Sequence, residues 1–164
     1  MKRRELVGVI GVGGFALLAS RIHAWASQPT DAIEKILRTD EEWRQILTPA
    51  QYHVLREEGT ERAFTSTLDK EYGKGTYVCV GCELALFKSE TKYDSGTGWP
   101  SFYQPIAGSI GTRLDFKLIV PRTEYHCARC EGHQGHVFSD GPPPTGKRYC
   151  NNGLALEFLP EDRA

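Results

Sequence analysis

Two Cys-x-x-Cys pairs constrain the fold of this chain more than any other feature. Cys79 and Cys82 form the first pair, and Cys127 and Cys130 form the second. Two such pairs can offer four thiolates to one tetrahedral ion, and the long segment between them can fold as a domain around it. The pattern predicts one structural zinc ion. The alternative is a pair of disulfides, which an exported protein allows.

The fifth cysteine of the chain, Cys150, lies outside both pairs. If the paired cysteines hold a metal, Cys150 is free to do chemistry. A catalytic thiol has to ionise near neutral pH, and a neighbouring cation is a usual means of lowering its pKa from about 8.5. Because Arg148 is close in sequence, we predict that Cys150 is a nucleophile whose pKa is lowered.

Two histidines, His133 and His136, lie among glycines that permit tight turns and close approach of the backbone. Imidazole titrates near neutral pH, so we predict that these residues supply a proton or orient a substrate. A second metal site and purely structural histidines are the alternatives.

Residues 93–102 place Trp99 and Phe102 in a segment too rich in glycine and proline for regular structure. The residue types leave two interpretations open. The aromatic rings either fill the core, or they form a pocket for a small apolar group or a polarisable sulfur atom.

The N-terminus is predicted to be an export signal over residues 1–26. Basic residues at 2–4 precede an apolar run over 6–19, and Ala24-Trp25-Ala26 matches a small-x-small cleavage pattern. The Arg3-Arg4 pair resembles a twin-arginine signal. We expect an exported, periplasmic protein. Retention of the leader as a membrane anchor is the alternative, although its apolar run is short and rich in glycine.

The rest of the chain is long enough for one ordinary core, since the whole has 164 residues and is 40% hydrophobic. Beyond the leader the charge is mildly acidic, with no clustered basic stripe, which argues against a nucleic-acid partner. No large hydrophobic stripe is visible, so a monomer is expected.

The local sequence predicts a small helical segment followed by an antiparallel β body. Thr39 or Asp40 can cap a helix, and Pro49 suits the first turn of another. Helices are expected over 31–37, 40–47 and 49–58, and β-type runs over 76–78, at 106 and 110, and over 118–120 and 154–159. Residues 141–146 contain three consecutive prolines and predict a loop.

Several motifs, in order, resemble the methionine-R-sulfoxide reductase B family over residues 42–158. They are Gly59-Thr60-Glu61-Arg62-Ala63-Phe64, Gly75-Thr76-Tyr77-Val78-Cys79, residues 93–102, Arg122-Thr123-Glu124, residues 135–142 and Arg148-Tyr149-Cys150-Asn151-Asn152. The resemblance implies a mainly β fold of two small antiparallel sheets, with short N-terminal helices and a structural zinc site. It divides the chain into the leader over 1–26, a linker leading into a helix over 27–41, and the reductase domain over 42–160.

The resemblance also implies a role for each candidate residue. Cys150 attacks the sulfoxide, the aromatic loop with Trp99 and Phe102 forms the substrate pocket, and Trp99 holds the terminal methyl group. His133, His136 and Asn152 orient the sulfoxide and help to protonate its oxygen. The zinc ligands are the four paired cysteines. The implied substrate is oxidised methionine, mainly in proteins.

One position departs from many family members. Thr97 lies where they carry a resolving cysteine, between Gly96 and Gly98. The sulfenic acid at Cys150 then needs an external thiol, such as a thioredoxin-like protein. A non-catalytic zinc-bearing β module that binds partner proteins is the alternative function, and a sensor that oxidises once is a weaker one.

Overall fold

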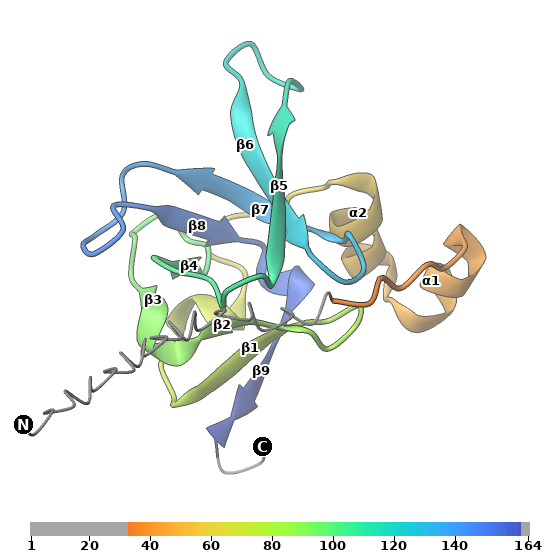
Figure 1. Cartoon of the computed structure of the whole chain (residues 1–164), viewed down its shortest axis with the longest axis horizontal. Helices are drawn as coiled ribbons and strands as arrows, with labels where there is room; N and C mark the ends of the chain where they lie inside the picture. The colour runs from red at the N-terminus through yellow and green to blue at the C-terminus, as the bar shows by residue number, and fades with distance from the viewer. Residues whose placement is uncertain (1–32, 162–164) are drawn as a thin grey trace, which may run out of the picture. The chain divides into compact units, whose positions relative to one another are not determined.

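The computed structural model describes residues 33–161 (Figure 1), so the predicted leader over 1–26 lies outside the described residues. Two short α-helices come first, and two antiparallel β-sheets form the rest. The predicted mainly β fold class is confirmed. Within this part of the chain, no helix is long and apolar enough to cross a membrane.

The smaller sheet contains three strands in the order β2-β1-β9. They are β1 (Gly75–Cys79), β2 (Ala85–Lys88) and β9 (Leu156–Pro160). The larger sheet contains six strands in the order β3-β4-β8-β7-β6-β5. They are β3 (Lys92–Tyr93), β4 (Ser101–Phe102), β5 (Ile110–Asp115), β6 (Arg122–Cys127), β7 (His133–Phe138) and β8 (Arg148–Asn151). Short 3-10 turns cover Thr67–Lys70, Ser89–Thr91 and Gly153–Ala155.

Both α-helices begin with a capping box. Helix α1 (Asp40–Ile46) follows Thr39, whose side chain accepts from the Glu42 amide while the Glu42 side chain accepts from the Thr39 amide. Helix α2 (Pro49–Glu57) follows Thr48, which makes the same reciprocal pair with Gln51. Each box satisfies two amides that a helix start leaves without a partner. The helices predicted over 40–47 and 49–58 are confirmed.

The helix expected over 31–37 does not form in its described part, because residues 33–39 have no regular structure. Instead, the Ile36 amide donates to the Arg129 carbonyl over 2.9 Å, so this segment lies along the second cysteine pair. In this segment the Ile36 amide therefore bonds to a distant part of the chain and not to a carbonyl of its own helical turn.

The strand expected over 118–120 is also wrong. These residues form the turn between β5 and β6, and Ile119 is fully exposed. Hydrophobic composition predicted a strand there, but all three residues are more than half exposed.

Aromatic side chains from both sheets form the centre of the core. Phe87 stacks on Phe102 with ring centroids 4.2 Å apart, and Tyr77 meets Phe102 edge-on at 4.9 Å. Tyr125 packs edge-on against Phe87 at 6.1 Å. Because Tyr77 and Phe87 come from the smaller sheet and Phe102 and Tyr125 from the larger one, these contacts hold the two sheets together.

Candidate functional site

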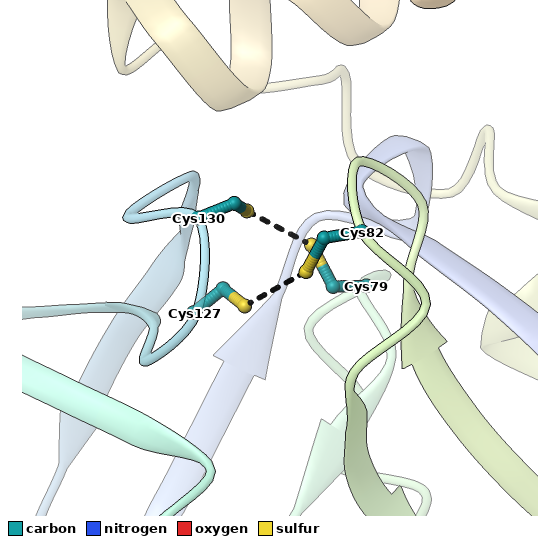
Figure 2. A group of neighbouring side chains, drawn as sticks. All are labelled: Cys79, Cys82, Cys127 and Cys130. Carbon is teal, nitrogen blue, oxygen red and sulfur yellow. Dashed lines mark hydrogen bonds between the residues drawn. The ribbon is translucent and has the colours of Figure 1, made fainter. Parts of the chain in front are cut away.

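Four cysteine sulfurs meet where the two sheets approach each other (Figure 2). Cys79 is the last residue of β1 in the smaller sheet, and Cys127 is the last residue of β6 in the larger one. Cys82 and Cys130 follow in the turns, and all four sulfurs lie within 4.8 Å of one another. A metal ion held here would join the two sheets.

The two cysteine pairs adopt the same turn. The Glu83 amide donates to the Cys79 carbonyl over 2.7 Å, and the Glu131 amide donates to the Cys127 carbonyl over 2.9 Å. Glu83 and Glu131 are both left-handed, with φ of 61° and 60°. These repeated turns point both sulfurs of each pair toward the same centre, as Figure 2 shows.

The sulfur geometry suits a tetrahedral ion better than disulfides. Cys79 and Cys130 have sulfurs 3.6 Å apart, and Cys82 and Cys127 have sulfurs 3.4 Å apart. A bonded pair would be about 2.05 Å apart, whereas zinc–sulfur bonds of about 2.3 Å in a tetrahedron separate sulfurs by about 3.8 Å. The Gln134 side-chain amide also donates to the Cys79 sulfur over 3.4 Å, which favours a thiolate.

A second site, with Cys150 in its wall, lies on the larger sheet. This cavity of about 300 Å³ is lined by residues that include Thr97, Trp99, His136, Phe138, Cys150 and Asn152. Four of the predicted site residues therefore surround one cavity: Trp99, His136, Cys150 and Asn152. Among its described lining residues, Cys150 is the only cysteine.

Strand register brings His136 next to Cys150. They lie directly opposite each other on β7 and β8, so both side chains project from the same face of the sheet. His136 Nε2 donates to Asp115 Oδ2 over 2.7 Å, and the same Asp115 oxygen accepts from Arg122 over 2.7 Å. The carboxylate thus fixes the orientation of the His136 ring, and Nδ1 is the ring nitrogen that Asp115 does not occupy.

Burial lowers the pKa of His136, although the hydrogen bond to Asp115 partly opposes this effect. The ring is therefore neutral at neutral pH, with its proton on the Nε2 that faces Asp115. In that form Nδ1 can accept a proton, and the carboxylate can stabilise the imidazolium that results.

Burial raises the pKa of the Cys150 thiol, while the charge of Arg148 and the neighbouring Thr97 hydroxyl lower it. Burial dominates, so the pKa is raised overall and the predicted lowering is wrong, although Arg148 acts in the predicted direction. Asp140, which binds the Arg148 guanidinium through two contacts of 2.9 and 2.8 Å, raises the pKa further. The resting thiol therefore keeps its proton at neutral pH.

His133 lies behind the cavity wall instead of lining it. Its side chain is buried, and Nδ1 pairs with Glu124 Oε1 over 2.8 Å. Its ring meets that of His136 edge-on, with centroids 5.4 Å apart. Among the described protein atoms, its buried Nε2 has no hydrogen-bond partner. His133 is thus placed to support His136 and to offer one free nitrogen to a water molecule or a ligand.

Glu61 positions Trp99 and Asn152. The Trp99 indole donates to the Glu61 carbonyl over 3.2 Å, and the Glu61 amide donates to Asn152 Oδ1 over 3.0 Å. The Asn152 side-chain amide also donates to the Gln134 carbonyl over 3.0 Å. Asn152 therefore lines the cavity while fastening the Glu61 segment to β7.

Phe102 does not line the cavity, in contrast to its expected role in the substrate pocket. It is fully buried and stacks on Phe87. The two aromatic residues of the loop thus separate, with Trp99 facing the cavity and Phe102 filling the core. The sequence left both interpretations open, and each applies to one ring.

Sequence reasoning assigned no role to Asp115, Glu124 or Arg122. Arg122 and Glu124 belong to a motif that carried the family resemblance, which was the only signal for them. Asp115 had none, because it reaches His136 only through the pairing of β5, β6 and β7.

Comparison with known proteins shows the family to which this chain belongs. Residues 47–160 match the SelR domain. Peptide methionine sulfoxide reductase MsrB of Pseudomonas putida (strain W619) is 55% identical over 134 residues, which cover 80% of this chain and 100% of that protein. The MsrB of Leptospira interrogans (strain 56601) is 52% identical over 128 residues, covering 77% and 98%.

A plant protein shows similar likeness. Peptide methionine sulfoxide reductase B1, chloroplastic, of Arabidopsis thaliana is 54% identical over 121 residues, or 73% of this chain and 60% of that protein. The domain match spans the two cysteine pairs and the residues that line the cavity described above. This chain therefore belongs to the SelR family, the B-type methionine sulfoxide reductases.

Proposed function

We propose that this protein reduces methionine-R-sulfoxide to methionine, mainly in polypeptides. The observation that carries the proposal is the placement of one free thiol, Cys150, opposite His136 in a cavity that Trp99 also lines. The names of the relatives support methionine sulfoxide as the substrate. The selectivity for the R epimer and the reaction steps described below are part of this proposal and go beyond what those names state.

The cavity can hold the reacting end of the substrate. Trp99 and Phe138 provide aromatic surface for a methyl group and a polarisable sulfur atom. The volume of about 300 Å³ suits one side chain rather than a folded domain. We infer that Trp99 contacts the terminal methyl group, so that the sulfoxide oxygen points toward His136.

The proton that the reaction needs is already on Cys150. His136 Nδ1 accepts it from the thiol, and Asp115 stabilises the resulting imidazolium. The thiolate attacks the sulfoxide sulfur while His136 returns the proton to the oxygen, which makes the oxygen a better leaving group. The attack forms a bond between the two sulfurs. The substrate S–O bond then breaks as the oxygen passes to the Cys150 sulfur, and the S–S bond breaks, which releases methionine and leaves a sulfenic acid. The substrate sulfur gains two electrons, the Cys150 sulfur loses two, and the proton ends on the sulfenic acid.

An external thiol then regenerates Cys150. It attacks the sulfenic acid, water leaves, and a second thiol reduces the mixed disulfide. Thr97 lines the cavity beside Cys150, but its hydroxyl cannot form a disulfide. The other four cysteines form the separate cluster. These placements support a one-cysteine cycle that depends on a thioredoxin-like protein or a small thiol.

We further propose that Cys79, Cys82, Cys127 and Cys130 hold one structural zinc ion. Four thiolates suit zinc and leave no open position for a substrate. Metal content should be one zinc per chain, and a strong chelator at neutral pH should unfold the protein as it removes the ion. Full stability after complete metal loss would contradict this role.

The predicted leader supports export to the periplasm. Cleavage after Ala26 would leave Ser27 as the first residue of the mature protein. Sequencing of the N-terminus in a periplasmic fraction tests this proposal. A full-length chain that sediments with membranes would indicate a retained anchor instead.

The replacement Cys150→Ser tests the catalytic proposal. It should abolish reduction of methionine-R-sulfoxide with dithiothreitol as donor, while circular dichroism and metal content stay unchanged. If the variant retains activity, Cys150 is not the nucleophile. If the wild-type protein binds metal but reduces no sulfoxide, the non-catalytic binding module becomes the better interpretation.

A further inference from the structure

The hairpin formed by β5 and β6 projects from the larger sheet (Figure 1). Exposed apolar side chains lie at its turn end. We name these residues the apolar tip: Leu114, Phe116, Leu118, Ile119 and Val120. Each is more than half exposed, and Ile119 is completely so. A concentrated apolar surface on a projecting element marks a place where another molecule binds.

The strand pair at the turn end of the same hairpin lies beside the active-site cavity. Asp115 at the end of β5 faces Arg122 at the start of β6. Arg122 lines the cavity, and Asp115 holds the His136 ring. The apolar tip therefore begins where the cavity wall ends.

The basic residues of the hairpin are already paired. Arg113 binds Glu58 and Glu124, Lys117 binds Glu58, and Arg122 binds Asp115. Binding to an anionic lipid surface depends on basic residues that can face the headgroups. Among the described residues 113–122, each positive charge has a carboxylate partner, so the tip suits an apolar and uncharged partner better.

A hollow of about 320 Å³ lies beside the hairpin. Its apolar lining residues are Leu114 and Phe116, and the rest of its lining is charged: Glu58, Arg113, Asp115, Lys117 and Glu124. The apolar surface next to the cavity is therefore the tip itself.

We propose that the apolar tip binds apolar residues next to the oxidised methionine in an unfolded polypeptide substrate. This inference rests on the proposed function. When a methionine sulfoxide side chain fills the cavity, the residues on either side of it lie at the rim, close to where the loop of the hairpin begins at Asp115 and Arg122. Methionine is mostly buried in folded proteins among other apolar residues, so the chain around it is apolar once it is exposed.

Three substrates with a methionine-R-sulfoxide test the inference, with dithiothreitol as donor. They are the free amino acid, a five-residue peptide with leucine and valine beside the sulfoxide, and a peptide of equal length with serine and glycine there. Wild-type protein should prefer the apolar peptide by about tenfold in kcat/KM, mainly through KM. The double variant Ile119→Ser/Val120→Ser should lose this preference and keep its activity on the free amino acid.

Leu37→Ser is the matched control, because Leu37 is an exposed aliphatic residue outside the hairpin. It should keep the preference, and Leu118→Ser should reduce it as a second variant of the tip. Equal kcat/KM for both peptides with wild-type protein would overturn the inference. So would a double variant that loses activity equally on all three substrates.

Two other results would assign the tip to a different partner and overturn the inference. One is a loss confined to assays with a thioredoxin system, which would make the tip a docking site for the donor. The other is binding of wild-type protein, but not the double variant, to phosphatidylglycerol vesicles while peptide preference stays unchanged. No turnover of any sulfoxide by wild-type protein would overturn the proposed function itself and this inference with it.

Discussion

His136 and Cys150 lie directly opposite each other on the neighbouring strands β7 and β8. This register places an imidazole beside the only thiol of the cavity, and Asp115 holds that imidazole from the far side. Because Cys150 retains its proton in the resting state, the nucleophile depends on a base that can remove it. The pair His136–Asp115 supplies that base.

Replacing His136 should therefore slow the chemical step. His136→Asn should lower kcat by a factor of about 10² to 10⁴, the usual range for loss of a general acid–base group. Asp115→Asn should lower kcat less, by about tenfold, because the His136 ring remains while its orientation and the stabilisation of its positive charge weaken. Steady-state kinetics with methionine-R-sulfoxide and dithiothreitol measure both effects. His53→Asn, at an exposed position of α2, is the control and should leave kcat unchanged.

The ionisation of Cys150 should reflect burial more than the nearby cation. Burial raises its pKa above the ordinary 9.0, so alkylation by iodoacetamide should be slow at pH 7 and speed up as the pH rises past 9. Arg148→Ala removes a charge that favours the thiolate, so it should move the curve to still higher pH. Alkylation rates from pH 6 to 11 give this profile. An inflection below pH 7 in the substrate-free protein would contradict it.

Thr97 and Cys150 line the same cavity, and the family resemblance implies a resolving cysteine at position 97 in many members. Thr97→Cys should therefore create an internal route for recycling. After one turnover without donor, the variant should lose two thiols and form a disulfide between positions 97 and 150, which mass spectrometry can identify. Thr97→Ser is the control and should stop at the sulfenic acid. Absence of the disulfide in the cysteine variant would show that the two side chains do not meet during the cycle.

Glu124 should make stability depend on pH. Burial raises its pKa, but hydrogen bonds with His126 and His133 and the charge of Arg113 outweigh burial and lower it from 4.5 to about 2. The folded state therefore binds this proton less tightly than the unfolded state does. The ionised carboxylate stabilises the fold above pH 4.5, and that contribution is lost as the pH falls toward 2.

Glu124→Gln should remove this pH-dependent contribution. The variant should be less stable at pH 7 by on the order of 3 kcal/mol, with a smaller further loss between pH 4.5 and 2 than the wild type shows. Urea denaturation at several pH values measures the difference. Parallel pH profiles for the two proteins would contradict the account.

The parts of the structure that short sequence patterns determine could be predicted. Thr39 and Thr48 cap their helices because the side chain and the backbone it binds are three residues apart. The two cysteine pairs could be recognised as one ligand set because the cysteines of each pair are only three residues apart. Cys150 was recognised because it belongs to neither pair, and the ordered motifs around it were specific enough to identify the family.

The features that depend on tertiary structure could not be predicted. The pKa of Cys150 is set by how deeply β8 is buried, which Arg148 does not reveal. Asp115 reaches His136 across three strands, and no local pattern relates the two residues. The apolar run over 118–120 has the composition of a strand, yet it forms the exposed loop that joins β5 to β6, and no local pattern shows that these side chains stay outside the core.

The most direct test of the account is the turnover of the two resolved epimers of methionine sulfoxide in a peptide, with dithiothreitol as donor. The wild-type protein should convert the R epimer to methionine and leave the S epimer unchanged, and Cys150→Ser should convert neither. Conversion of the S epimer, or turnover of the R epimer by Cys150→Ser at the wild-type rate, would contradict the proposed function.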